Sequence, residues 1–321
     1  MKLKNLNINI KELVLGKFGV VICLIVLCLV FGIISPIFLS WGNIQNILIQ
    51  AGTNAMIAAG MTIVIISGGI DLSVGSIVAL SSVIGANIMI QTNNVLLGII
   101  VTLLVGIFLG FFNGILISYL DFPPFIVTLS TMWLFRGVAY VITNGQAIVN
   151  LPESNMNLAL GRFLHIPYIV WLIIMAYLIC YFILHYFTVG IKIYAVGDNS
   201  ESARLSGVNV KLVKLIVFTI SGFMSAIGAV ILMSRLNSGQ PVAGQSFEMS
   251  AIAAAVIGGT SLTKGGVGSI GGTLIGALFI SSLLNGLVIL NVTSFWQQVF
   301  MGIVVLVAIG IDRYRKIILN K

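Results

Sequence analysis

The sequence predicts an all-α, polytopic membrane protein of about ten transmembrane helices. Hydrophobic residues make up 59% of the 321 residues and charged residues only 7%, against roughly 25% charged residues in ordinary soluble domains. No charge interrupts the stretch between Lys17 and Asp71, or the one between Asp71 and Asp121. Each stretch exceeds the ~20 apolar residues that one bilayer crossing needs. Each is therefore expected to fold back as two spans.

Ten apolar runs, bounded by Pro, Gly, Asn or charged residues, are the expected spans. The first follows a basic patch, as in a signal peptide, but it is too long and lacks a small-x-small cleavage site, so we expect a retained helix. The third and eighth are short and rich in Ser, Gly or Ala, which allows them to be broken or only partly embedded. In chain order the spans cover residues 18–39, 45–66, 74–91, 95–118, 124–143, 168–188, 212–233, 247–262, 270–290 and 295–311.

Rows of glycine four residues apart occur in the fourth span and near the ninth. Small residues at this spacing let helix backbones approach closely. We expect packing within the chain, with a dimerisation face as the alternative. The rows are Gly106, Gly110 and Gly114, and Gly268, Gly272 and Gly276.

The distribution of basic residues predicts the orientation of the chain. The positive-inside rule places Lys and Arg on the cytoplasmic side, and a cytoplasmic N-terminus puts thirteen of the sixteen there. Arg136, Arg162 and Arg235 remain outside or within a span. The reversed topology would invert this ratio, so both termini are expected in the cytoplasm. The thirteen are Lys2, Lys4, Lys11, Lys17, Lys192, Arg204, Lys211, Lys214, Lys264, Arg313, Arg315, Lys316 and Lys321.

No residue pattern in the sequence indicates catalysis. The three cysteines lie in apolar runs, and His165 and His185 are 20 residues apart, so a metal site or disulfide is not expected. Neither a metalloprotease motif nor a nucleophile motif occurs. The net charge of +8 reflects membrane orientation, so no nucleic-acid partner is expected. We expect no catalytic residue, metal or cofactor, and without a P-loop any ATP must bind another polypeptide.

Residues 192–214 are too polar to span a membrane and fall on the cytoplasmic side. Asn199 or Ser200 can cap a short helix with Glu201 in its first turn, and Gly207 can end it in a left-handed backbone. Such a helix would lie parallel to the membrane. Composition alone fits a docking element and an ordinary amphipathic connector equally well.

Four stretches resemble permeases of the ribose-type sugar ABC importer family, in the branched-chain-amino-acid/ribose permease superfamily. Residues 197–208, read GDNSESARLSGV, resemble that family's coupling loop, with Ser202 in place of the usual middle alanine. The other stretches are residues 60–76, GMTIVIISGGIDLSVGS, residues 125–137, FIVTLSTMWLFRG, and residues 251–262, AIAAAVIGGTSL. The resemblance extends over nearly the whole chain after residue 18.

The resemblance implies the permease subunit of a type II ABC importer in the bacterial cytoplasmic membrane. It implies one transmembrane domain over residues 1–321, with a coupling segment at residues 192–214. It also implies a permease homodimer, a cytoplasmic ABC ATPase and an extracytoplasmic sugar-binding protein. The expected cargo is a monosaccharide, with ribose suggested by overall similarity alone. The implied ATPase-coupling residues are Asn199, Glu201, Ser202, Ala203, Arg204, Leu205 and Gly207.

Within this segment we expect Leu205 to fill an apolar pocket on the ATPase, while Glu201 and Arg204 fix the register. Elsewhere, five polar residues are candidates for the translocation pathway or a gate. Asp71 can cap the next helix or act as a gate, and Arg136 can line a vestibule or reach the headgroups. The others are uncharged amides, suited to sugar hydroxyls or to bonds between helices: Asn54, Asn113 and Asn285.

Two other function classes compete with an ATP-driven importer. An ion-coupled secondary sugar transporter fits the composition equally well, but it usually needs an ionisable cluster in the membrane. The deep interior offers little beyond Arg136. A membrane enzyme is opposed by the missing catalytic motifs.

Overall fold

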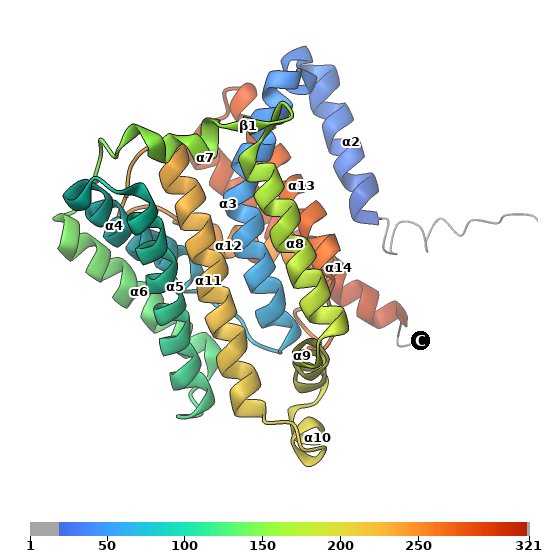
Figure 1. Ribbon diagram of the computed structural model, residues 1–321. Helices are drawn as coiled ribbons and strands as arrows, with labels where there is room; N and C mark the ends of the chain where they lie inside the picture. Colours follow the sequence, from blue (N-terminus) through green and yellow to red (C-terminus); the bar gives the residue numbers. More distant parts are fainter. Residues whose placement is uncertain (1–18, 320–321) are drawn as a thin grey trace, which may run out of the picture.

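The computed structural model describes residues 19–319, which form a bundle of α-helices (Figure 1). Every one of the ten predicted spans is a helix. Among the described residues, eight helices are long and apolar enough to cross a membrane, and two more apolar helices are shorter. The ten are α2 (Gly19–Ile34), α3 (Trp41–Ile66), α4 (Val74–Thr92), α5 (Val95–Ser118), α6 (Pro124–Thr143), α8 (Tyr168–Tyr186), α11 (Val210–Leu236), α12 (Phe247–Ile257), α13 (Ile270–Ile289) and α14 (Ser294–Leu319).

Smaller elements connect these helices. One end of the bundle carries the two short helices between α8 and α11, and we call it the α10 end. The opposite end carries a β-hairpin and two short helical turns, and we call it the hairpin end (Figure 1). The connecting elements are η1 (Pro36–Leu39), η2 (Glu153–Met156), α7 (Asn157–Leu160), β1 (Arg162–Phe163), β2 (Ile166–Pro167), α9 (Thr188–Asp198) and α10 (Ser200–Leu205).

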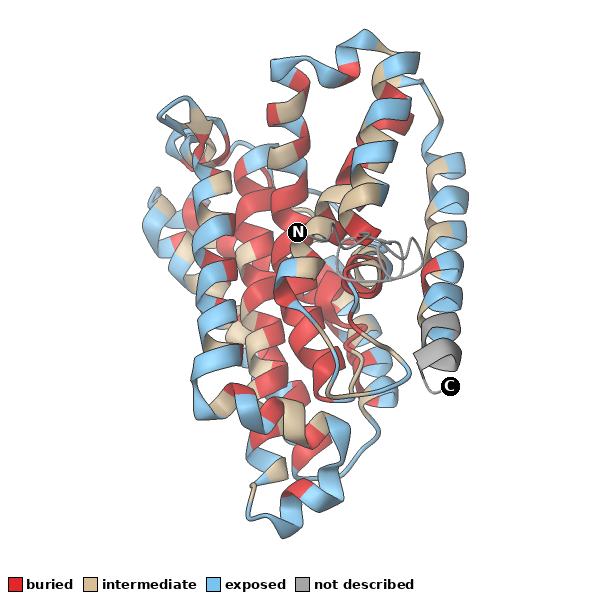
Figure 2. Cartoon of the chain, turned by 90° about the vertical axis from the view of Figure 1, so that its right-hand side faces the viewer, coloured by how far each residue is buried: buried red, intermediate tan, exposed pale blue. Residues whose placement is uncertain are grey.

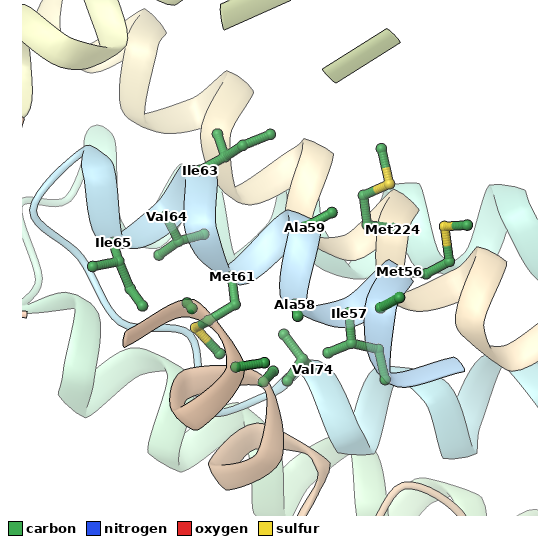
Figure 3. Close-up of a cluster of buried hydrophobic side chains, with 14 of the residues drawn as sticks. Met56, Ile57, Ala58, Ala59, Met61, Ile63, Val64, Ile65, Val74 and Met224 are labelled. Carbon is green, nitrogen blue, oxygen red and sulfur yellow. The ribbon is translucent and has the colours of Figure 1, made fainter. Parts of the chain in front are cut away.

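Helix α3 is the centre of the bundle. Every residue from 51 to 66 is buried (Figure 2), and α11, α13, α12 and α8 all contact this helix. A helix that is apolar on every side is expected inside a bundle. Figure 3 shows its side chains packed between Val74, the first residue of α4, and Met224 of α11.

Helices α5, α6 and α14 lie at the outside and expose large apolar side chains along their length. Leu104, Trp133 and Leu306 are each more than half exposed. Contiguous apolar surface on this scale does not face water in a soluble protein. The chain is therefore a multi-pass membrane protein.

Two spans are shorter than the sequence indicates. The first helix ends at Ile34 and gives way to the 3-10 turn η1, because Pro36 lacks an amide proton and cannot continue an α-helix. Helix α12 has 11 residues, about 16 Å at 1.5 Å per residue, or roughly half of the ~30 Å hydrocarbon core. Residues 237–246, which precede α12, form irregular chain with a single bridge between Gly239 and Ile148.

The glycine rows pack within the chain, as expected. A Cβ on Gly110 would lie 2.5 Å from the carbonyl oxygen of Phe218 in α11, and one on Gly276 would lie 2.0 Å from the carbonyl oxygen of Ala254 in α12. The backbones of α5 and α11, and of α12 and α13, therefore touch directly.

Most of the described basic residues lie toward one of the two ends, and the α10 end holds more of them. Lys192, Arg204, Lys211 and Lys214 belong to α9, α10 and the start of α11, and Lys264 lies 3.6 Å from Asp198 at the same end. Arg162 and Arg235 belong to elements at the hairpin end. Residues Lys2, Lys4, Lys11, Lys17 and Lys321 lie outside the described residues. That the α10 end is cytoplasmic remains a prediction.

Candidate functional site: the α10 helix and the buried polar groups

Helix α10 is a short, capped helix at one extremity of the molecule. Asn199 has an extended backbone, and its side-chain oxygen accepts a hydrogen bond from the Ser202 amide at 2.9 Å. Of the two predicted caps, Asn199 is therefore the one that the structure uses. Ala203 is buried against the bundle. The cap and this one buried side chain fix which face of the helix points outward.

The outward face of α10 carries an ion pair and an exposed leucine. Arg204 donates to both carboxylate oxygens of Glu201, at 3.0 and 2.6 Å. These hydrogen bonds, and then the Arg204 charge, hold the pKa of the Glu201 carboxyl below its ordinary value. Leu205 is 74% exposed. Leu205 is thus a large apolar side chain on the outward face of an otherwise polar helix.

Gly207 ends α10 as the sequence predicts. Its φ is +83°, a left-handed conformation that glycine adopts without strain. Its amide donates to the Arg204 carbonyl oxygen at 3.0 Å, and the Val208 amide donates to that of Ala203 at 3.0 Å. This arrangement satisfies the last carbonyls of the helix and turns the chain into α11.

Helix α9 joins α10 to the core of the bundle. The Cα of Gly197 lies so close to the end of α3 that an added Cβ would meet the Ile66 carbonyl oxygen at 1.7 Å. The same oxygen accepts a hydrogen bond from the Gly266 amide at 2.8 Å, and Tyr194 donates to the Gly268 carbonyl oxygen at 3.2 Å. The α9–α10 unit therefore rests on the end of α3 and on the α12–α13 loop.

Asp71 is fully buried and joins three helices. One carboxylate oxygen accepts from the Ser73 amide at 3.0 Å and from the Ser73 hydroxyl at 2.6 Å, and the other accepts from the Ser221 hydroxyl of α11 at 2.7 Å. Asn113 of α5 donates to the Ser73 hydroxyl at 2.8 Å. The carboxylate thus organises the turn before α4 and ties it to α11, rather than bonding the first free amides of α4 as a helix cap does.

Arg136 is half-buried on α6 and holds the irregular segment between α11 and α12. Its guanidinium donates to the Pro241 carbonyl oxygen at 2.8 Å and to that of Ala243. These bonds satisfy two backbone carbonyl groups of an irregular segment, which lipid could not do.

The three asparagine candidates differ in their partners. Asn285 accepts a hydrogen bond from the Asn43 side chain at 2.9 Å, which joins α13 to α3. Asn113 uses its amide nitrogen on Ser73, although its oxygen is buried without a partner. The side-chain nitrogen and the side-chain oxygen of Asn54 are both buried without a hydrogen-bond partner.

The structure thus groups the predicted residues into two places. The coupling residues share α10 and its caps, whereas the five pathway candidates are spread through the bundle interior. Sequence reasoning missed Ser221, Asn43 and Thr53, because a polar residue in an apolar span carries no signal that names its partner.

Among the described residues, no group of His, Cys, Asp or Glu side chains could hold a metal ion.

Comparison with known proteins matches the whole helical region. The family model described as "Branched-chain amino acid transport system / permease component" matches residues 43–309. The chain is 44% identical over 302 residues to the ribose import permease protein of Bacillus subtilis, covering 94% of each chain. It is 40% identical to that of Escherichia coli K12, covering 92% of this chain and 93% of the relative.

Permeases named for other sugars are similar over the same length. The D-allose transport system permease protein of Escherichia coli K12 is 38% identical over 92% of this chain and 91% of the relative. The L-arabinose ABC transporter permease protein of Azospirillum brasilense is 36% identical over 94% of this chain and 89% of the relative. No solved structure gives a significant match. The chain belongs to the branched-chain amino acid transport system permease family.

Proposed function

We propose that this chain is the permease subunit of an ABC importer that carries a monosaccharide, most simply ribose, across the cytoplasmic membrane. The sugar is suggested by relatives named as ribose import permeases at 40 to 44% identity. The observation that carries the mechanism is α10 itself, a capped helix that exposes Leu205 and rests on the core helices. The relatives' names give no support to an ion-coupled transporter.

The remaining subunits follow from this role. An ABC ATPase docks on the α10 end, which is then cytoplasmic, and a sugar-binding protein delivers the cargo at the hairpin end. A second copy of the permease completes the pathway. The chain itself catalyses no reaction, because ATP hydrolysis belongs to the ATPase.

Coupling works through direct contact. Leu205 fills an apolar pocket on the ATPase, and the Glu201–Arg204 pair presents both charges in a fixed geometry. When the ATPase closes on ATP, it displaces α10, and α9 transmits this to the end of α3 and the α12–α13 loop through Gly197 and Gly266. Rigid-body tilting of these helices alternates access between the two faces.

Gly207→Val tests this coupling. A β-branched side chain in a left-handed backbone costs about 1–2 kcal/mol of conformational strain, which is enough to redirect the end of α10. Steric clash does not contribute, because nothing lies within 4 Å of the added Cβ. We expect ATP-dependent uptake of labelled ribose to be lost at normal membrane expression. The matched control is Gly271→Val, at the start of α13, where the space is also open and φ is ordinary. Normal uptake by Gly207→Val would refute the docking role of α10.

The partner subunits are tested in proteoliposomes. Purified permease, ATPase and sugar-binding protein should import ribose only when all three and ATP are present. Uptake that persists without the ATPase would contradict the proposal and favour ion-coupled transport.

A further inference from the structure

A cavity of about 140 Å³ lies between α3, α11, α12 and α13. It sits toward the hairpin end, because Arg235 is in the last turn of α11 and Gln45, upstream in α3, contacts the backbone of His165 near the hairpin. The apolar ring of Phe247, the first residue of α12, forms part of its wall. Its polar lining consists of Gln50, Thr53, Asn54, Arg235, Ser250 and Ser281.

Two of these side chains are buried with hydrogen-bonding capacity that the protein does not use. Asn54 is 8% exposed and Thr53 is 2% exposed, and neither the Asn54 amide atoms nor the Thr53 hydroxyl has a partner. Each such group costs about 1–3 kcal/mol when left unsatisfied. By contrast, Asn43, which also belongs to α3, donates a hydrogen bond to Asn285 of α13 at 2.9 Å. Packing of α3 against its neighbours therefore does not account for the polarity at residues 53 and 54.

The chemistry of the lining points to a neutral ligand with several hydroxyl groups. The amides of Asn54 and Gln50 and the hydroxyls of Thr53 and Ser281 both donate and accept hydrogen bonds, as sugar hydroxyls do. Arg235 is the single charged group in the lining, and among the described residues it makes no ion pair. No carboxylate lines the cavity. At about 140 Å³ it is smaller than the ~300–1,000 Å³ of pockets for drug-sized ligands, so its occupant is a smaller molecule.

We propose that this cavity is a sugar subsite of the translocation pathway, in which Asn54 and Thr53 bind hydroxyls of a single monosaccharide. The proposal rests on the proposed sugar import. The subsite lies between α3, α12 and α13, and the α9–α10 unit contacts the end of α3 and the α12–α13 loop. Movement of α10 therefore reaches the helices that form the subsite, so that the ATPase can open and close it.

Asn54→Leu separates a ligand role from a structural one. Leucine has nearly the shape of asparagine, and an apolar replacement removes the cost of burying unpartnered polar atoms. We expect the melting temperature of the purified permease not to fall, while ribose uptake at saturating binding protein falls about tenfold or more, as for a lost hydrogen bond in the rate-limiting complex. The control, Asn285→Leu, removes the hydrogen bond between α13 and α3 and leaves the Asn43 amide nitrogen with only the Phe38 carbonyl oxygen, so its melting temperature should fall.

Direct occupancy is tested by labelling. Ser250→Cys, in a chain whose three native cysteines are replaced by alanine, places a thiol at the cavity wall. We expect millimolar D-ribose to slow alkylation of this thiol by a small neutral maleimide, and inorganic phosphate to leave the rate unchanged. If the Asn54→Leu substitution is added to the Ser250→Cys chain and ribose then no longer slows alkylation, the protection depends on the Asn54 side chain.

The outcomes separate the two proposals. If the wild-type importer carries ribose but Asn54→Leu transports normally, or ribose gives no protection, the subsite is refuted and the importer stands. Protection by phosphate in place of ribose overturns the neutral-sugar assignment. If the complete importer carries no monosaccharide, the proposed function fails and the sugar assignment fails with it.

Discussion

Leu205→Ala gives the sharpest measure of ATPase docking. The change removes three carbon groups worth about 0.8 kcal/mol each when buried, or about 2.4 kcal/mol. Because Leu205 is 74% exposed in the permease, about three quarters of that, or about 1.8 kcal/mol, is available to a partner. At about 1.4 kcal/mol per tenfold change, the Kd for the ATPase should rise about 20-fold.

The assay is titration of the ATPase against the permease in lipid nanodiscs, with the melting temperature of the permease measured alone. The melting temperature should not change, since the side chain contributes little to the fold of the isolated chain. The matched control is Leu160→Ala in α7, which is 67% exposed at the hairpin end and should leave the Kd unchanged. An unaltered Kd for Leu205→Ala, or an equal loss for Leu160→Ala, would refute docking through α10.

Two further predictions concern the buried charges. Asp71→Asn keeps one acceptor oxygen but loses the charge. We expect a lower melting temperature, equivalent to a loss of about 1.5–3 kcal/mol for a charged hydrogen bond, while ribose uptake is retained. Abolished uptake in a stably folded variant would instead support a gate. Arg136→Met keeps the apolar stem but releases the carbonyls of Pro241 and Ala243, so hydrogen exchange of residues 237–246 should increase while that of α10 does not. Unchanged exchange in that segment would contradict the tether.

The positions of the helices and of their caps could be predicted from the sequence because they depend on neighbouring residues. The ten apolar runs correspond to ten helices, since the length of a run that lipid accepts is a local property. Asn199 and Gly207 were identifiable for the same reason, as a cap involves residues within one or two turns. The length of α12 was overestimated, although residues 258–262, GGTSL, carry a local stop signal: Gly259 adopts a left-handed φ of +93° and ends the helix.

The roles of the polar side chains inside the bundle depended on the tertiary structure. Asp71 and Ser221 are 150 residues apart in sequence, and Asn43 and Asn285 are 242 apart. Arg136 likewise bonds carbonyls 105 and 107 residues away. The sequence by itself determined which segments enter the membrane and which short helix stands outside it. Only the packed structure decided that Asn285 has a partner and Asn54 has none, because a hydrogen bond between helices depends on which faces meet, and no local pattern encodes that.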